Sequence, residues 1–352
     1  MPKKLGRREL GRSVLGVGLS ALGAPSCGSV ARGAARGGAA AVAITGKVDV
    51  WSCYDLPADD PRSRELSGIA WDDATRTLFA VQDELAAIVP LRPDATFQRW
   101  SFGEAIRLDV PGPLDLEGIA LGKDGFFLAS EIGPRLLEVD RAGHHLRDYA
   151  PPPKFLEALR NKSFESLALD PSKSVLYTTS ETALPRDDDA SRGGTGARVR
   201  ILQIDLATGA IREHAYATDA VVTGGGDYGV SDLTALATDD LLVLERGFRK
   251  GIGNSVRIHR VNLDDPRSAC DGIERLSPEV PVLAKKLLVD LATLPADLAS
   301  PPKQPQTTAL MENYEGMTTG PRLPDGRLAL FLVSDDNGSP KQTPRVLTLA
   351  LG

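Results

Sequence analysis

The stretch Glu117-Gly-Ile-Ala-Leu-Gly-Lys-Asp-Gly-Phe-Phe-Leu-Ala-Ser-Glu131 indicates the fold. It contains two apolar runs of strand length, separated by the turn formers Lys123-Asp124-Gly125 and bounded by an acidic residue at each end. Because a hairpin brings its first and last residues to the same end, Glu117 and Glu131 are expected to be neighbours. The apolar runs are nearly continuous, which is typical of strands that are buried on both faces.

Four further copies of this phrase occur along the chain. They span residues 67–83, 165–181, 232–245 and 315–335. The first residues of the five copies are separated by 50, 48, 67 and 83 residues, which is the spacing of propeller blades with insertions. The sequence therefore predicts an all-β protein, a single β-propeller over residues 47–352 with five four-stranded blades.

Each hairpin needs two outer strands to complete its blade. The last copy is followed by only one, at residues 345–351, whereas an unassigned strand at residues 48–56 precedes the first copy. Pairing the two would close the ring and remove its free edges. Six blades is the alternative, because the longest interval could hold a degenerate blade at residues 279–306, although the prolines there favour an inserted loop.

Radial packing would bring the acidic ends of the hairpins to one mouth of the central channel. The expected metal ligands are Glu117, Glu131, Glu165, Glu181, Asp232, Glu245, Glu315 and Asp335, with Asp83 beside them. Crowded carboxylates repel one another unless a cation neutralises them, and calcium accepts about six to eight oxygen ligands. The sequence thus predicts a calcium site, although Ser67 replaces the leading acid in the first copy. The alternative is a structural role, in which the acids accept backbone hydrogen bonds or pair with arginines.

Residues 1–26 have the pattern of an export signal. Five basic residues precede a short apolar stretch at residues 13–24, and Arg7-Arg8 resembles the twin-arginine signal. Residues 24–27 resemble a lipoprotein cleavage site that would leave a lipid on Cys27, and residues 39–43 offer an ordinary one. Residues 27–46 are accordingly either a flexible Gly/Ala-rich tether or part of the leader. Either reading predicts a protein of the periplasm or cell envelope.

Without residues 1–26 the chain has 36 basic and 46 acidic residues, a net charge of −10. This balance argues against nucleic acid and against an anionic membrane surface as partners, and it suits divalent cations. We expect a monomer that binds a small anionic or phosphorylated substrate and contacts a membrane only through a lipid on Cys27. Cys53 and Cys270 could form a disulfide in an oxidising compartment, but the sequence does not show that they meet.

Five ordered motifs resemble the phytase-like family, described by an esterase-like activity of phytase. They are Asn161-Lys-Ser-Phe-Glu-Ser-Leu-Ala-Leu169, Val230-Ser-Asp-Leu-Thr-Ala-Leu236, Leu244-Glu-Arg-Gly-Phe248, Asn313-Tyr-Glu-Gly-Met317 and Val333-Ser-Asp-Asp-Asn337. The resemblance implies an exported bacterial propeller with phosphoesterase or esterase activity.

The leading functional hypothesis is a calcium-dependent phosphoesterase. The expected catalytic residues are Glu165, Glu245, Glu315 and Arg246, of which the arginine would hold a phosphate. The signal for a serine hydrolase, Gly-x-Ser-x-Gly, is missing downstream of the leader. One alternative is a non-catalytic propeller that binds a ligand or partner at the cell surface, and another is a metal-dependent lactonase.

Overall fold

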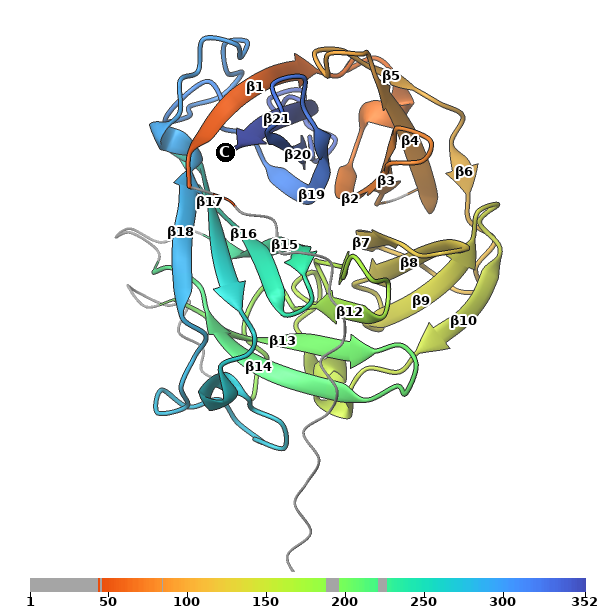
Figure 1. The fold of residues 1–352 in the computed structure, drawn as a ribbon, viewed down its shortest axis with the longest axis vertical. Helices are drawn as coiled ribbons and strands as arrows, with labels where there is room; N and C mark the ends of the chain where they lie inside the picture. The colour runs from red at the N-terminus through yellow and green to blue at the C-terminus, as the bar shows by residue number, and fades with distance from the viewer. Residues whose placement is uncertain (1–43, 45, 84, 188–195, 221–226) are drawn as a thin grey trace, which may run out of the picture. The chain divides into compact units, whose positions relative to one another are not determined.

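The computed structural model describes residues 44, 46–83, 85–187, 196–220 and 227–352, all within the unit Gly38–Gly352. Figure 1 shows this unit as a ring of sheets whose innermost strands lie around the centre. The expected export signal at residues 1–26, with Cys27 and nearly all of residues 27–46, lies outside the described residues. Of the helices within the described ranges, none is long and apolar enough to cross a membrane.

The described residues form five blades, each an antiparallel sheet that runs outward from the channel. The first blade contains β2 (Leu66–Asp72), β3 (Thr77–Gln82), β4 (Ala87–Pro93) and a divided outer strand, β5 (Trp100–Phe102) and β6 (Ile106–Arg107). The second contains β7 (Leu116–Leu121), β8 (Gly125–Ser130), β9 (Arg135–Asp140) and β10 (His145–Tyr149). The third contains β11 (Ala168–Leu169), β12 (Val175–Thr178), β13 (Arg198–Asp205) and β14 (Ile211–Ala217). The fourth contains β15 (Asp227–Ala237), β16 (Asp240–Arg249), β17 (Gly253–Asn262) and β18 (Lys285–Asp290). The fifth contains β19 (Tyr314–Arg322), β20 (Leu328–Ser334), β21 (Arg345–Leu351) and β1 (Val48–Asp55).

This arrangement confirms the five-bladed propeller. The alternative of six blades is wrong, because residues 279–306 supply only the outer strand β18, a short 3₁₀ helix η4 (Leu291–Thr293) and irregular chain. Three other 3₁₀ helices, η1 (Pro61–Ser63), η2 (Pro153–Glu157) and η3 (Pro266–Ser268), lie in connections between strands. Within the described ranges there is no α-helix.

Strand β1 closes the ring, as expected. It pairs antiparallel with β21 from Val48 opposite Leu351 to Asp55 opposite Arg345. The last of these pairs is also an ion pair, since Arg345 Nε donates to Asp55 Oδ1 at 2.6 Å and the arginine side chain is fully buried. The blade interfaces are filled by the apolar side chains of the paired strands. Cys53, which lies in β1, and the buried Cys270 are both free thiols, so the disulfide considered above is not formed.

Glycines at the start of the innermost strands let neighbouring blades approach closely. A Cβ atom added to Gly118 would lie 2.8 Å from the carbonyl carbon of Ser166 in the third blade. One added to Gly316 would lie 2.5 Å from the carbonyl oxygen of Ser67 in the first blade. Because such distances are too short for a real Cβ, only glycine fits. The Glu-Gly phrase therefore combines a close backbone contact with an acidic residue beside it.

We expect Asp55→Ala to lower the free energy of unfolding by about 3 kcal/mol, because it leaves the buried Arg345 guanidinium without its carboxylate. Arg345 would keep only its neutral acceptors, the carbonyl of Ala309 and the hydroxyl of Ser300. The control is Lys47→Ala at the other end of β1, whose ion pair with Asp49 is exposed. Its loss should cost less than about 1 kcal/mol. Denaturant unfolding measures both, and equal losses would contradict a closing role for the buried pair.

Candidate functional site

Strand register defines two equivalent positions at the channel end of each hairpin. In the second blade Leu116 pairs with Ser130, and the next residues are Glu117 and Glu131. The corresponding pairs in the other blades are Leu66–Gln82, Phe164–Ser180, Val230–Glu245 and Tyr314–Ser334. The residue after the first member, the leading position, is Ser67, Glu117, Glu165, Ser231 or Glu315. The residue after the second member, the trailing position, is Asp83, Glu131, Glu181, Arg246 or Asp335.

The fourth blade differs from the expected alignment by one residue. Asp232 pairs with Leu244 and stands where Gly118 stands in the second blade. Glu245 stands where Ser130 stands, because it pairs with Val230. The structure therefore does not bring Asp232 and Glu245 to the channel mouth with the other expected ligands. The trailing position of this blade holds Arg246 in place of a carboxylate.

Asp232 has a structural position between two blades. It is 2% exposed, and its carboxylate accepts the backbone N–H of Leu233 at 2.8 Å and that of Met317 at 2.6 Å. Met317 belongs to β19, so the carboxylate links the innermost strands of the fourth and fifth blades. Burial raises the pKa of Asp232 well above its ordinary value, and the backbone donors oppose that shift.

Glu245 lies in a separate buried cluster with Asp219 and His259, whose nearest ligand atoms are within 4.8 Å of one another. Two cations already neutralise its carboxylates. Lys285 Nζ lies 2.6 Å from Asp219 and 2.7 Å from Glu245, and Arg257 Nη1 lies 3.0 Å from Asp219. Burial lowers the pKa of His259. This cluster is therefore an ion-pair network rather than a set of unneutralised metal ligands.

The other expected carboxylates interact at one end of the channel, together with Asp115. We call this group the acidic mouth, and it consists of Asp83, Asp115, Glu117, Glu131, Glu165, Glu181, Glu315 and Asp335. Several of its members are nearly inaccessible to solvent, among them Glu165 at 6% and Glu181 at 3% exposure. Hydrogen bonds fix the edges of the group. Ser67 Oγ donates to Glu117 at 2.7 Å, and the backbone N–H of Ser163 donates to Glu131 at 2.7 Å.

Two cations reach one side of the acidic mouth. Arg246 Nη2 lies 3.2 Å from Glu315 Oε1 and 3.6 Å from Glu181 Oε1, and Lys162 Nζ lies 2.6 Å from Glu181 Oε2. Burial acts to lower the pKa of Arg246, but the carboxylates of Glu315 and Glu181 outweigh it, so the net shift is upward. Among the described residues, the buried Nε of this arginine has no hydrogen-bond partner. Arg246 thus stays charged.

The opposite side carries carboxylates with raised pKa values. Burial, and then the neighbouring Asp115, raises the pKa of Asp83 from 3.8 to about 8. Burial also raises the pKa of Glu117 well above its ordinary value, with a further contribution from the charge of Glu315. Glu165 lies between the two sides, since it interacts with both Glu117 and Arg246, and its pKa is raised by burial and then by the charges of Glu117 and Glu181. Each of these carboxyl groups therefore keeps its proton to a higher pH than an ordinary carboxyl group does.

Asp83, Asp115 and Glu117 are the members best placed to share an ion, since each offers an oxygen within 4.8 Å of the others. Asp115 was not among the residues expected from sequence. It lies two residues before the leading Glu117, the position that Glu65 occupies in the first blade. An acidic residue two positions before the leading residue occurs in both the first and the second copy, and this was the sequence signal that could have identified Asp115.

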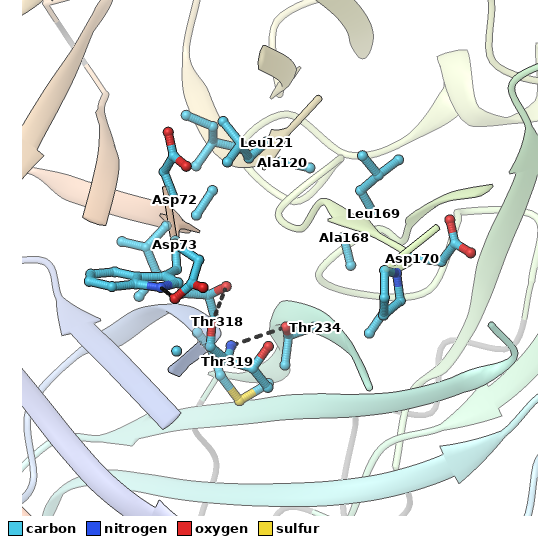
Figure 2. A pocket seen from close by; sticks show the side chains of 18 of the residues that line it. Asp72, Asp73, Ala120, Leu121, Ala168, Leu169, Asp170, Thr234, Thr318 and Thr319 are labelled. Carbon is cyan, nitrogen blue, oxygen red and sulfur yellow. Dashed lines mark hydrogen bonds between the residues drawn. The ribbon is translucent and has the colours of Figure 1, made fainter. Parts of the chain in front are cut away.

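The other end of the channel contains a different cavity, of about 680 Å³ (Figure 2). It lies beyond a ring of five buried apolar side chains, one from each blade: Ile69, Ile119, Leu167, Leu233 and Met317. Figure 2 shows that alanine, leucine and threonine side chains dominate its wall. Its acids are already engaged, because Arg141 pairs with Asp72 at 3.1 Å and backbone N–H groups donate to Asp170. The crowded carboxylates and this cavity are therefore two separate places.

Comparison with known proteins gives one family. The model of the family described as Phytase-like, esterase-like activity of phytase, matches residues 61–338. No curated protein sequence matches the chain.

Solved structures give distant likenesses. One is a putative oxidoreductase (glucose dehydrogenase) from Thermus thermophilus, at 14% identity and a TM-score of 0.40, covering 84% of this chain and 99% of that one. Another is the PQQ-bound aldose sugar dehydrogenase from Streptomyces coelicolor, at 14% identity and a TM-score of 0.39, covering 88% and 100%. A third is a streptogramin B lyase, at 13% identity and a TM-score of 0.38, covering 86% and 100%. None of these likenesses assigns an activity to this chain.

In the presence of a chelator, we expect the melting temperature to fall as the pH rises from about 4 to about 8. Asp83 has a pKa of about 8 when folded and 3.8 as its ordinary value, so in this range the folded state holds a proton that the unfolded state has released. The stabilising contribution of Asp83 is therefore complete below a pH of 3.8 and is lost as the pH rises to about 8. Thermal melts across this range test the expectation.

Asp83→Asn is the control variant for that experiment, because it removes the titrating group. Its melting temperature in chelator should depend less steeply on pH than that of the wild type. A wild-type melting temperature that rises steadily over the same range would contradict the raised pKa values of the acidic mouth.

Proposed function

The chain belongs to the Phytase-like family, and we propose that it is a calcium-dependent hydrolase of phosphate esters whose reaction takes place at the acidic mouth. The observation that carries the proposal is the division of this mouth into two sides. Asp83, Asp115 and Glu117 crowd together on one side, and the charged Arg246 lies on the other. A phosphate ester needs both a centre that neutralises its oxygens and a donor that orients it.

The residues present suit calcium. Asp83, Asp115 and Glu117 supply only oxygen ligands, as a hard cation requires. Burial, followed by the neighbouring Asp115, raises the pKa of Asp83, and a bound cation would oppose that shift. Bound calcium would polarise a phosphoryl oxygen and make a coordinated water more acidic. The cluster of Asp219, Glu245 and His259 does not suit an ion in the same way, because Lys285 already bridges its two carboxylates.

The side chains of the mouth have distinct roles in this proposal. Arg246 binds a phosphoryl oxygen through its charged guanidinium group. Glu165 lies near Glu117, Glu131 and Glu181. Once a cation favours its ionised form, Glu165 would accept the proton that the attacking water loses. The water oxygen bonds to phosphorus, the bond from phosphorus to the ester oxygen breaks, and the alcohol leaves with the proton that Glu165 took from the water. Glu315 positions Arg246 through their 3.2 Å ion pair.

Export is part of the proposal. The basic and apolar pattern of residues 1–26 supports delivery to the periplasm or cell envelope. The acidic balance of the remaining chain supports a small substrate over nucleic acid as the partner.

We expect calcium to raise both the melting temperature and the turnover of phosphate monoesters, and Glu117→Gln to abolish most of both effects. The substitution removes a charged ligand oxygen while keeping the shape of the side chain. Asp73→Asn, in the cavity at the other end of the channel, is the control and should respond to calcium like the wild type. Calcium titrations followed by thermal melts and by phosphate release provide the two measurements.

The same titrations, run with a carboxylate ester and a lactone beside the phosphate ester, separate the competing functions. Calcium-linked stabilisation without turnover of any of these substrates would indicate a binding protein instead of an enzyme. Preferential turnover of the lactone would indicate the lactonase alternative.

Arg246→Gln should lower kcat/KM for a phosphate monoester by on the order of a hundredfold, because it removes the charged donor for the phosphoryl group. Arg322→Gln in the other cavity is the control, since the side chain of Arg322 donates to the carbonyl of Gly326 within its own hairpin. Steady-state kinetics with calcium at saturation measures the effect. Unchanged kcat/KM in the Arg246 variant would remove this residue from the site.

A further inference from the structure

An apolar cavity adjoins the acidic mouth. It has a volume of about 480 Å³ and lies between the chain that follows β8 and the segment around η2. Ile132, Leu156 and Leu159 line it and are exposed by 38%, 60% and 53% of their surface. Exposed apolar side chains gathered in one concave place mark a binding site more often than an ordinary surface does.

The cavity and the acidic mouth share two residues. Asp115 and Glu131 line the cavity, and both also belong to the acidic mouth. Asp115 is in addition one of the three carboxylates best placed to share an ion. A molecule whose reacting group lies at those carboxylates can therefore extend its remaining part along the apolar wall.

We propose that this cavity binds the apolar group of the substrate, so that the protein selects esters of a hydrophobic alcohol over polyphosphorylated ones; the proposal rests on the hydrolase function proposed above. An alkyl or aryl group gains from leaving water against Leu156 and Leu159. A molecule with several phosphates meets Asp115 and Glu131 along the same path, and their two negative charges outnumber the positive charge of Arg160, which also lines the cavity. The cavity volume is within the range usual for small-molecule sites.

The test compares methyl, butyl and hexyl phosphate and myo-inositol hexakisphosphate as substrates of the full chain with calcium. We expect kcat/KM to rise by about fourfold for each methylene that is buried, and to be lowest for the hexakisphosphate. Leu159→Ser should reduce the gain from methyl to hexyl phosphate by at least half. Leu146→Ser is the matched control, because Leu146 is also 53% exposed but lies on the outer strand β10. It should keep the wild-type dependence on chain length.

Calorimetric binding of methyl-, butyl- and hexylphosphonate, which are not hydrolysed, separates this proposal from the proposed function. Affinity that rises with chain length and falls in the Leu159 variant supports the apolar site even if no ester is turned over, in which case only the hydrolase function fails. Turnover and binding that are independent of chain length, or a preference for the hexakisphosphate, would overturn the apolar site while leaving the hydrolase intact. Absence of both turnover and phosphonate binding would overturn both.

Discussion

The close approach of the innermost strands at their first residues is the constraint on which the site depends. Gly118 and Gly316 leave no room for a side chain against the neighbouring blade, so the residues beside them are brought together from different blades. Those residues are Glu117 and Glu315, and the charge of the second raises the pKa of the first. Packing of the apolar blade interfaces holds them there in spite of the repulsion. The favourable free energy of packing the blades thus offsets the repulsion between carboxylates that would otherwise move apart.

The fourth blade modifies this pattern in a useful way. Arg246 replaces the trailing carboxylate found in the other four blades, so the ring contains one cation opposite its most crowded acids. A ring of identical acidic residues could bind a cation, but it would repel an anion. Under the function proposed above, the arginine would bind the phosphate of the substrate while the carboxylates on the other side would bind the metal. The carboxylate of Asp232 meanwhile takes over the inter-blade contact that glycine makes elsewhere.

Sequence was sufficient for the fold because strand-length apolar runs, separated by turn formers, recur in five copies at the spacing of blades. The bounds of β21 agree with the expected strand at residues 345–351, and the pairing of β1 with β21 followed from counting outer strands. The site was less accessible to such reasoning. The fourth blade has the same bulge as the second and fifth, but its acidic residues lie one position away from the equivalent ones. A shift of one residue exchanges the two faces of a strand. Alignment of the acidic residues in the sequence therefore placed Asp232 and Glu245 at the mouth. The strand pairing instead places Ser231 and Arg246 there.

The pairing of β1 with β21 joins residues that are about three hundred positions apart along the chain. Closing a loop of that length costs on the order of 5 kcal/mol of chain entropy, and the cost grows only logarithmically with length. The effect on the folding rate is greater, because contacts between residues distant in sequence slow folding. The seven paired residues of this seam therefore couple the first and last blades into one cooperative unit, and a partly folded chain exposes a ring with two unsatisfied edges until the seam forms.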